Sequence, residues 1–207
     1  MKTNLLYLLS FAAALTLTGC PDPVCFNPEP VYSFAVTAHF TPEQDSIQVG
    51  DTLYLISEFP STMRPVGGQE AVVYTNSTGI GNTLGVLELT PNKSTLDAVY
   101  SFDYFNVDGM IYNSKKIPTP ERAQQIRYKE EGEKYILKVG IIPKKRGTYS
   151  LIIGSGLSNG RRTGDECSKA SFSTSLTNTD YHQYLYESWW GEPVSPEPDY
   201  RYLFKVY

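Results

Sequence analysis

The sequence predicts an all-β domain, built as a sandwich or barrel of about eight strands. Two observations predict this class. Apolar and polar residues alternate in many runs along the chain, a period of two that turns one face of each strand toward a core. Gly, Pro and Asn separate these runs at short intervals, as they do in the turns between consecutive strands. The chain has no internal repeat and no heptad pattern, so a single domain is expected.

The alternation is clearest in the stretch 31–40. Phe34, Val36 and Ala38 are expected to face the core there, with a polar residue between each pair. Further strands are expected at 51–59, 71–75, 84–90, 98–104, 135–141, 148–154 and 202–206. The stretch 129–133 contains a glycine and has the length of a hairpin loop, so the chain on its two sides should pair antiparallel.

One helix is expected near the C-terminus, after this succession of strands. The sequence Asn-Thr-Asp at 178–180 offers capping side chains, and Gly191 occupies a position at which helices commonly stop. An apolar stripe recurs every four residues between these limits, at Tyr181, Leu185 and Trp189. The helix is therefore expected to pack with this stripe facing inward.

The N-terminus has the features of an export signal. Lys2 precedes an apolar run over 5–15 that is too short to span a bilayer. The following Leu17-Thr18-Gly19-Cys20 resembles the lipobox of bacterial lipoproteins. This resemblance implies that residues 1–19 are removed and that Cys20 is acylated, which makes a lipid bilayer the first expected partner. An ordinary signal peptide with a chance cysteine is the alternative.

The segment after the lipobox is expected to be a tether. Four prolines within 21–30 predict an extended chain over 20–30, which leaves 31–207 as one folded domain. Such a chain is expected in a bacterial cell envelope, anchored at the outer membrane on either its periplasmic or its cell-surface side. Cys25 and Cys167 would then lie in an oxidising compartment, and a disulfide between them is expected, with two free thiols as the alternative.

Composition argues against several kinds of function. The formal charge of −4 argues against a nucleic-acid partner, because such proteins normally carry a clustered basic excess. His39 and His182 are the two histidines, and their spacing fits neither a metal site nor a nucleophile–base pair. Asp103 and Glu88 lie within apolar strands, where alternation turns them toward solvent. We therefore expect no catalytic residue, no metal site and no cofactor, and a protein that is not an enzyme.

Aromatic and basic residues give the main lead to a ligand. Tyr186 and Trp190 point away from the inward stripe of the expected helix, and exposed aromatic rings suit stacking on sugar or peptide. A glycine-rich stretch over 154–168 carries Arg161 and Arg162, which suit an anion or the acid group of a glycan. The alternatives are rings that cover an open end of the sandwich and a long connection without a binding role.

Several segments resemble small lipoproteins of Bacteroidetes-type bacteria, a largely uncharacterised family. These are the lipobox and the segments 49–53, 146–151, 167–176 and 202–206. The resemblance covers the whole chain as a loose pattern, and it implies an immunoglobulin-like antiparallel β-sandwich with one short helix near the C-terminus. These bacteria O-glycosylate Asp followed by Ser or Thr and an apolar residue, a pattern that places candidate sites at Ser46 and Thr52.

These features together predict a membrane-anchored envelope lipoprotein that acts as a non-enzymatic binding or structural accessory module. One alternative is a glycan-binding lipoprotein of a saccharide-uptake system, which would use the aromatic helix and the Arg161-Arg162 segment together. Another is a fimbrial subunit that polymerises by strand exchange. A hydrolase ranks last, because no nucleophile–base pair is recognisable.

Overall fold

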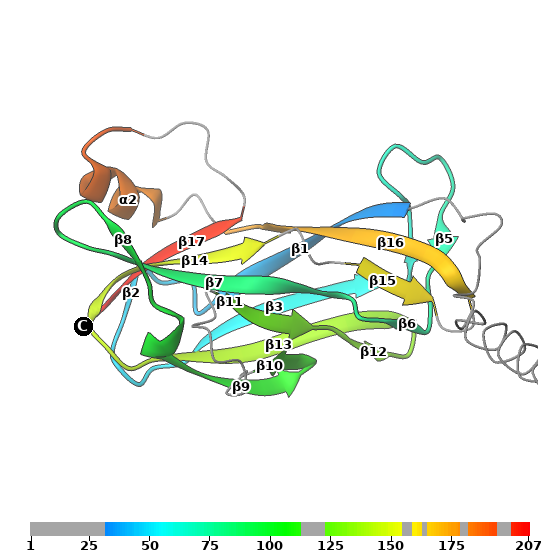
Figure 1. The fold of residues 1–207 in the computed structure, drawn as a ribbon, viewed down its shortest axis with the longest axis horizontal. Helices are drawn as coiled ribbons and strands as arrows, with labels where there is room; N and C mark the ends of the chain where they lie inside the picture. The colour runs from blue at the N-terminus through cyan, green and yellow to red at the C-terminus, as the bar shows by residue number, and fades with distance from the viewer. Residues whose placement is uncertain (1–31, 113–122, 155–158, 163–164, 179–181, 194–199) are drawn as a thin grey trace, which may run out of the picture.

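Two large β-sheets pack face to face and form the body of the structure (Figure 1). The computed structural model describes residues 32–112, 123–154, 159–162, 165–178, 182–193 and 200–207. Both sheets contribute buried side chains to a shared core. The all-β sandwich predicted from the alternating pattern is therefore confirmed.

The first sheet has eight strands. In spatial order seven of them are β12 (Lys129–Glu131), β13 (Lys134–Pro143), β3 (Leu53–Pro60), β1 (Tyr32–Thr41), β16 (Asp165–Leu176), β15 (Asn159–Arg162) and β6 (Ser77–Thr78). The eighth, β9 (Phe102–Asp108), pairs with β13. β1 thus occupies an interior position, between β3 and β16.

The second sheet has seven strands. In spatial order six of them are β10 (Met110–Tyr112), β11 (Ala123–Arg127), β7 (Gly81–Leu89), β14 (Gly147–Gly154), β17 (Arg201–Val206) and β2 (Ser46–Ile47). The seventh, β8 (Thr95–Asp97), pairs with β7. A separate pair is formed by β4 (Thr62–Met63) and β5 (Val72–Val73), and a single 3₁₀ turn spans Val99–Ser101.

Two expectations about the strands are corrected. The sandwich is not wholly antiparallel, because β1 pairs with β16 and β17 pairs with β2 in parallel registers. The partners in each pair are far apart in the chain, and parallel neighbours need such long connections. The described residues also contain seventeen strands, against the expected eight or so. The additional ones are mostly two to five residues long, too short for alternation to reveal them.

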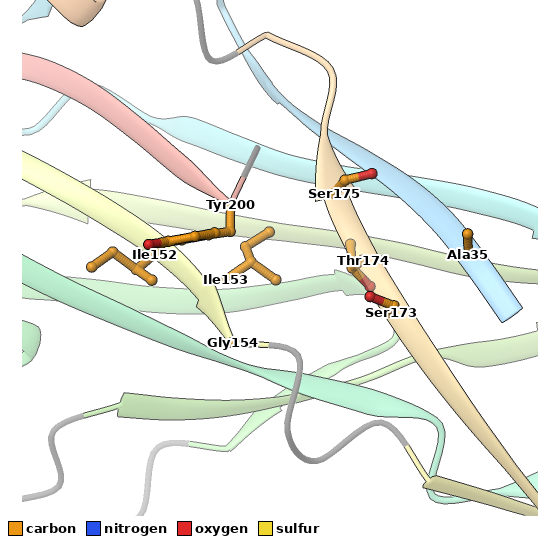
Figure 2. A pocket seen from close by; sticks show the side chains of 8 residues that line it. All are labelled: Ala35, Ile152, Ile153, Gly154, Ser173, Thr174, Ser175 and Tyr200. Carbon is orange, nitrogen blue, oxygen red and sulfur yellow. The ribbon is translucent and has the colours of Figure 1, made fainter. Parts of the chain in front are cut away.

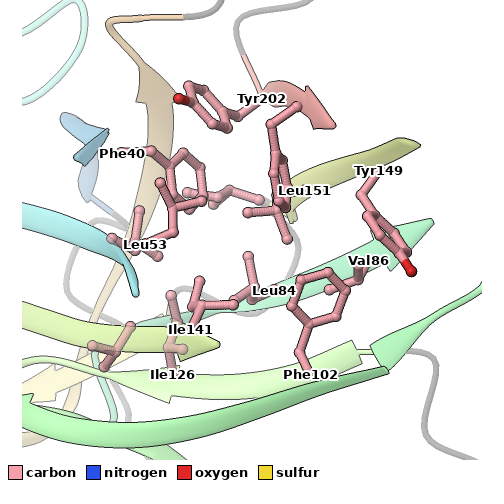
Figure 3. Close-up of a cluster of buried hydrophobic side chains, with 14 of the residues drawn as sticks. Phe40, Leu53, Leu84, Val86, Phe102, Ile126, Ile141, Tyr149, Leu151 and Tyr202 are labelled. Carbon is pink, nitrogen blue, oxygen red and sulfur yellow. The ribbon is translucent and has the colours of Figure 1, made fainter. Parts of the chain in front are cut away.

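The core follows the predicted alternation closely. In β1, Phe34, Val36 and Ala38 are all buried, while the residues between them are exposed. The larger of two core clusters joins β3 and β13 of the first sheet to β7, β14 and β17 of the second, and it includes Leu53, Leu84 and Tyr149 (Figure 3). Full burial of such a side chain contributes about 1.5–3 kcal/mol, so the alternating positions supply much of the stability.

The predicted helix is present as α2 (Gln183–Trp190), and it ends where the sequence indicates. Gly191 adopts a left-handed conformation with φ of 92°, and its N–H donates to the Glu187 carbonyl at 2.7 Å. The expected cap is different. Asn178 instead bonds the backbone of Phe40, and His182 occupies the N-cap position without a side-chain capping bond. Residues 179–181 lie outside the described residues.

The sandwich has two distinguishable ends. β1 begins opposite Ala170 of β16, which in turn pairs with Gly160 of β15. β1 finishes near Phe40, whose backbone bonds Asn178 just before α2. We call these the β15 end and the α2 end, and they lie at opposite ends of the long axis (Figure 1). The chain therefore enters the described fold at the β15 end.

Candidate binding site

A pocket of about 410 Å³ opens where the edges of the two sheets meet, and we call it the hydroxyl pocket (Figure 2). It brings together side chains from β1, β14, β16 and the residue before β17. The lining residues are Ala35, Ile152, Ile153, Gly154, Ser173, Thr174, Ser175 and Tyr200. Its size falls within the range of about 300–1,000 Å³ typical of small-molecule sites.

The serines of the hydroxyl pocket come from the outward face of β16. The burial pattern alternates there, so that Phe172 and Thr174 are buried, Ser173 is exposed and Ser175 is half-buried. Among the described strands, β15 pairs with β16 only as far as Ser171. The edge of β16 beyond that residue is thus where the pocket forms.

Buried polar contacts fix the opposite wall of the pocket. Asn82 donates from Nδ2 to the Gly154 carbonyl at 3.0 Å and accepts from Thr174 Oγ1 at 3.3 Å. This bridge connects β14 to β16 across the sandwich. Gly154 also lacks room for a side chain, because a Cβ atom there would overlap Thr83 Oγ1. The wall is therefore held in place before any ligand binds.

Tyr200 supplies the exposed aromatic surface of the pocket. Its carbonyl accepts the Ile153 N–H at 2.9 Å, which extends the β14–β17 ladder by one residue and fixes the tyrosine backbone. Its side chain stays 41% exposed and lies close to Ile152 in the pocket (Figure 2). A flat apolar ring thus lies on the β14 side of the pocket, and the serine hydroxyls lie on the β16 side (Figure 2).

The lining has a definite chemical character. None of the eight residues is charged, whereas hydroxyl groups come from two serines, one threonine and one tyrosine. A charged ligand would lose hydration here without gaining an ion pair, and that loss is costly. A neutral ligand with both hydroxyl groups and an apolar face matches this lining.

The aromatic residues predicted from the helix behave differently from one another. Trp190 is 44% exposed, as expected. Tyr186 is half-buried and is covered by the Arg201 guanidinium, which lies 4.4 Å from the ring centroid. Trp189 donates from Nε1 to the Thr90 carbonyl at 2.6 Å, which attaches α2 to the loop before β8. The expectation that Tyr186 points freely outward is therefore wrong.

The exposed Tyr184 of α2 links the helix to β2. The Tyr184 hydroxyl donates to Asp45, and the Ser46 hydroxyl donates to the same carboxylate at 2.8 Å. These bonds lower the pKa of Asp45, and the Asp45 contact raises the pKa of Tyr184. Ser46, a predicted glycosylation site, is half-buried on β2, and Thr52 is half-buried just before β3. Modification of either residue stays a prediction.

The predicted basic pair does not join the aromatic helix. Arg161 and Arg162 lie on β15, at the opposite end of the sandwich from Trp190 (Figure 1). A single site that uses all four predicted binding residues is therefore not formed. Sequence reasoning missed the serines and Tyr200, although the alternation of 171–176 marks its serines as outward-facing.

The residues considered for catalysis are dispersed. His39 is exposed on β1, whereas His182 is buried with Nδ1 2.8 Å from the Leu203 carbonyl, to which it donates. Asp103 forms an exposed ion pair with Lys144 at 2.9 Å, and Glu88 lies in the other sheet. Within the described residues, no group of three or more His, Cys, Asp or Glu side chains is placed to hold a metal ion.

The anchor and the disulfide concern residues that the structure does not describe in full. Cys20 and Cys25 lie outside the described residues, and Cys167 is placed only as a backbone position on β16. Acylation and disulfide formation both stay predictions. In the part of the chain that the structure describes, no helix is long and apolar enough to cross a membrane.

The fold and the pocket together define a β-sandwich with an uncharged, hydroxyl-lined pocket. No protein-family model and no curated protein matches the sequence. The chain is similar to the type II cohesin dyad from the adaptor ScaA scaffoldin of Acetivibrio cellulolyticus, with 10% identity and a TM-score of 0.36, over 72% of this chain and 49% of that one. The chain thus spans about half the length of that structure.

A second similarity is to a CaDoc0917–CaCohA2 complex, with 11% identity and a TM-score of 0.28. It covers 70% of this chain and 100% of the other.

Proposed function

We propose that this chain is an exported, lipid-anchored binding protein of a bacterial envelope that binds a neutral saccharide without turning it over. The ligand class is inferred from the lining of the hydroxyl pocket, which combines hydroxyl groups with an exposed aromatic ring and carries no charge. A pyranose ring has the complementary surface, an apolar C–H face and a rim of hydroxyl groups. The anchor rests on the lipobox that ends at Cys20.

The saccharide is expected to lie with its C–H face on Tyr200 and its hydroxyl groups toward Ser173 and Ser175. Covering the 41% of Tyr200 that is now exposed would bury roughly 60–100 Å². At about 25 cal/mol per Å² this burial contributes about 2 kcal/mol, or about 30-fold in affinity. The serine hydroxyls supply orientation and specificity more than affinity, because each exchanges one hydrogen bond with water for another.

The test is binding to a panel of neutral oligosaccharides, followed by titration calorimetry on the best ligand. Tyr200→Ala should weaken binding about 30-fold, whereas Tyr200→Phe should retain most of the affinity because it keeps the ring. Trp190→Ala is the matched control, since it removes an equally exposed ring from α2. Loss of binding with Trp190→Ala but not Tyr200→Ala would move the site to the helix. No binding anywhere in the panel would refute the saccharide proposal.

Two further measurements address anchoring and turnover. Labelling with palmitate in a bacterial host should mark the wild-type chain and not Cys20→Ser, and an unlabelled wild type would refute the anchor. Mass spectrometry of the bound saccharide after prolonged incubation should show it unchanged. Cleaved products would refute a purely binding role.

The fimbrial alternative keeps one specific observation in its favour. β1 directly follows the predicted tether and lies between two strands, so its removal would leave a slot for a strand of another copy. That exchange would withdraw Phe34, Val36, Ala38 and Phe40 from the core. Limited proteolysis that removes β1 should then produce polymers, visible by size-exclusion chromatography. Unfolding or aggregation without ordered polymers would exclude this alternative.

A further inference from the structure

A second, more open pocket of about 700 Å³ has the opposite character, and we call it the cationic pocket. It is lined by Ser77, Gly79, Gly109, Met110, Arg127, Tyr128 and Lys129. The two charged members of this lining, Arg127 and Lys129, are both positive. The chain therefore carries two pockets whose linings favour chemically different ligands.

Arg127 is held firmly at this site by its backbone neighbours. It pairs with Met110 of β10 on one side and with Gly81 of β7 on the other. Gly109 has a φ of 75° and lies so close to the Arg127 carbonyl that a side chain there would collide with it. The close packing of β10 and β7 against the Arg127 backbone fixes the position of its Cα atom, and thus the point from which the side chain extends.

The Arg127 guanidinium keeps most of its hydrogen-bonding capacity. Its Nη1 donates to the Gly79 carbonyl, which uses one of the five N–H donors of an arginine. Within the described part of the chain, no carboxylate forms an ion pair with it. A planar fork of remaining donors is the usual means of holding an oxyanion in two-point contact.

Lys129 can add a second charge at little cost. Its Nζ lies 2.8 Å from Glu131 Oε2, but both side chains are more than half exposed, at 51% and 61%. Exposed ion pairs of this kind contribute about 0–1 kcal/mol. An anion that binds in the pocket can therefore replace Glu131 as the partner of Lys129 with little loss of free energy. Asp108 also lies close enough to affect Lys129, which balances part of the local charge.

The strand register brings the predicted basic pair to the same region. Arg162 of β15 lies opposite Ser77 of β6, and Arg161 lies opposite Thr78. Ser77 is itself part of the lining. Backbone topology therefore places two more basic residues on β15, the strand that pairs with β6.

One apolar member of this lining, Met110, is 43% exposed. An anion with an attached apolar group would cover this side chain. β6 and β12 lie toward the β15 end, where the chain enters the fold (Figure 1). The segment 20–31 spans at most about 40 Å when extended, so a membrane surface at Cys20 is within reach of this end.

We propose that the cationic pocket binds a phosphate-type oxyanion, through Arg127 and Lys129. Two sources share this chemistry, the anionic headgroup of a membrane lipid and a free phosphate compound. The lipid source rests on the membrane attachment proposed above. The free source does not.

The test is calorimetric titration of the full chain in a neutral detergent with three probes. Inorganic pyrophosphate represents the free source, dihexanoylphosphatidylglycerol the lipid source, and dihexanoylphosphatidylcholine is the zwitterionic control. We expect the phosphatidylglycerol or the pyrophosphate to bind and the phosphatidylcholine not to bind. Binding of the phosphatidylglycerol without pyrophosphate assigns the lipid source, and binding of pyrophosphate assigns the phosphate group itself.

Substitutions locate the site. Arg127→Gln with Lys129→Gln should weaken anion binding about 25-fold, or about fivefold for each charge removed. Lys145→Gln with Arg146→Gln is the matched control, because it removes the same charge from exposed residues between β13 and β14, at the α2 end (Figure 1). This control pair should change affinity less than about twofold.

A conservative variant separates recognition from folding. Arg127→Lys keeps the charge but loses the planar fork, so it should bind the anion more weakly than wild type and more tightly than Arg127→Gln, even if its melting temperature falls with that of Arg127→Gln. Equal losses in the two double variants, or no binding of either anionic probe by the wild type, would overturn the proposal. Saccharide binding at Tyr200 should not respond to Arg127→Gln, so the two proposals fail separately.

Discussion

Asn178 is expected to be among the polar residues on which the stability of this fold depends most. It is 5% exposed, and its side chain makes two hydrogen bonds to the backbone of Phe40. Oδ1 accepts the Phe40 N–H at 3.2 Å, and Nδ2 donates to the Phe40 carbonyl at 2.8 Å. The side chain thus continues the pairing of β1 beyond the end of β16, immediately before the chain turns toward α2.

Replacing Asn178 by alanine removes both bonds and leaves two buried backbone groups of Phe40 without partners. Each unsatisfied group costs about 1–3 kcal/mol. Entry of water can recover part of this cost, since the site lies near one end of the sandwich. We therefore expect Asn178→Ala to lower the free energy of unfolding by about 2–4 kcal/mol.

Urea-induced unfolding followed by circular dichroism measures this difference directly. Asn92→Ala is the matched control, because the Asn92 side chain accepts hydrogen bonds only within an exposed turn, from Thr90 and Ser94. It should cost less than about 1 kcal/mol. Equal effects of the two substitutions would refute the reasoning, because they would mean that the Phe40 backbone is adequately solvated without Asn178.

Three further predictions concern stability. Burial raises the pKa of both Tyr149 and Tyr202 from 10.0 to about 12, so the contribution of these two tyrosines to stability should be constant below pH 10 and fall between pH 10 and about pH 12. The expected slope is about 1.4 kcal/mol per pH unit and per tyrosine, measured by urea unfolding, and a flat profile would contradict it. Gly81→Ala should lower the free energy of unfolding by about 1–3 kcal/mol in the same assay, because the new Cβ overlaps the Ile126 carbonyl of β11. An unchanged urea midpoint would contradict this prediction, because it would show that β7 and β11 separate easily. Non-reducing mass spectrometry should find Cys25 joined to Cys167, and two alkylatable thiols would exclude the disulfide.

Local patterns were sufficient to predict the long strands and the end of the helix. Alternation in β1 identifies Phe34 and Val36 as buried, because in a strand the side of each residue is set by position alone. Gly191 ends α2 because it adopts a left-handed backbone conformation, which a residue without a Cβ atom reaches easily. This signal lies in a single residue, so the sequence alone reveals it. The two-residue strands β2 and β6 escaped prediction, since so short a segment becomes a strand only when a distant partner lies beside it.

The sequence by itself determined the alternating core, the helix and the chemical types available for binding. Only the tertiary structure decided which of these side chains line the same pocket. Ser173 and Tyr200 form one pocket with Ala35 because β16 lies beside β1 and close to the end of β14. The same topology separates Trp190 from Arg161 and places Arg162 opposite Ser77, which lines one pocket with Arg127. The spacing of residues along the chain does not predict which side chains come together in a pocket. Those contacts depend on how strands that are far apart in sequence pair, and on how the two sheets stack.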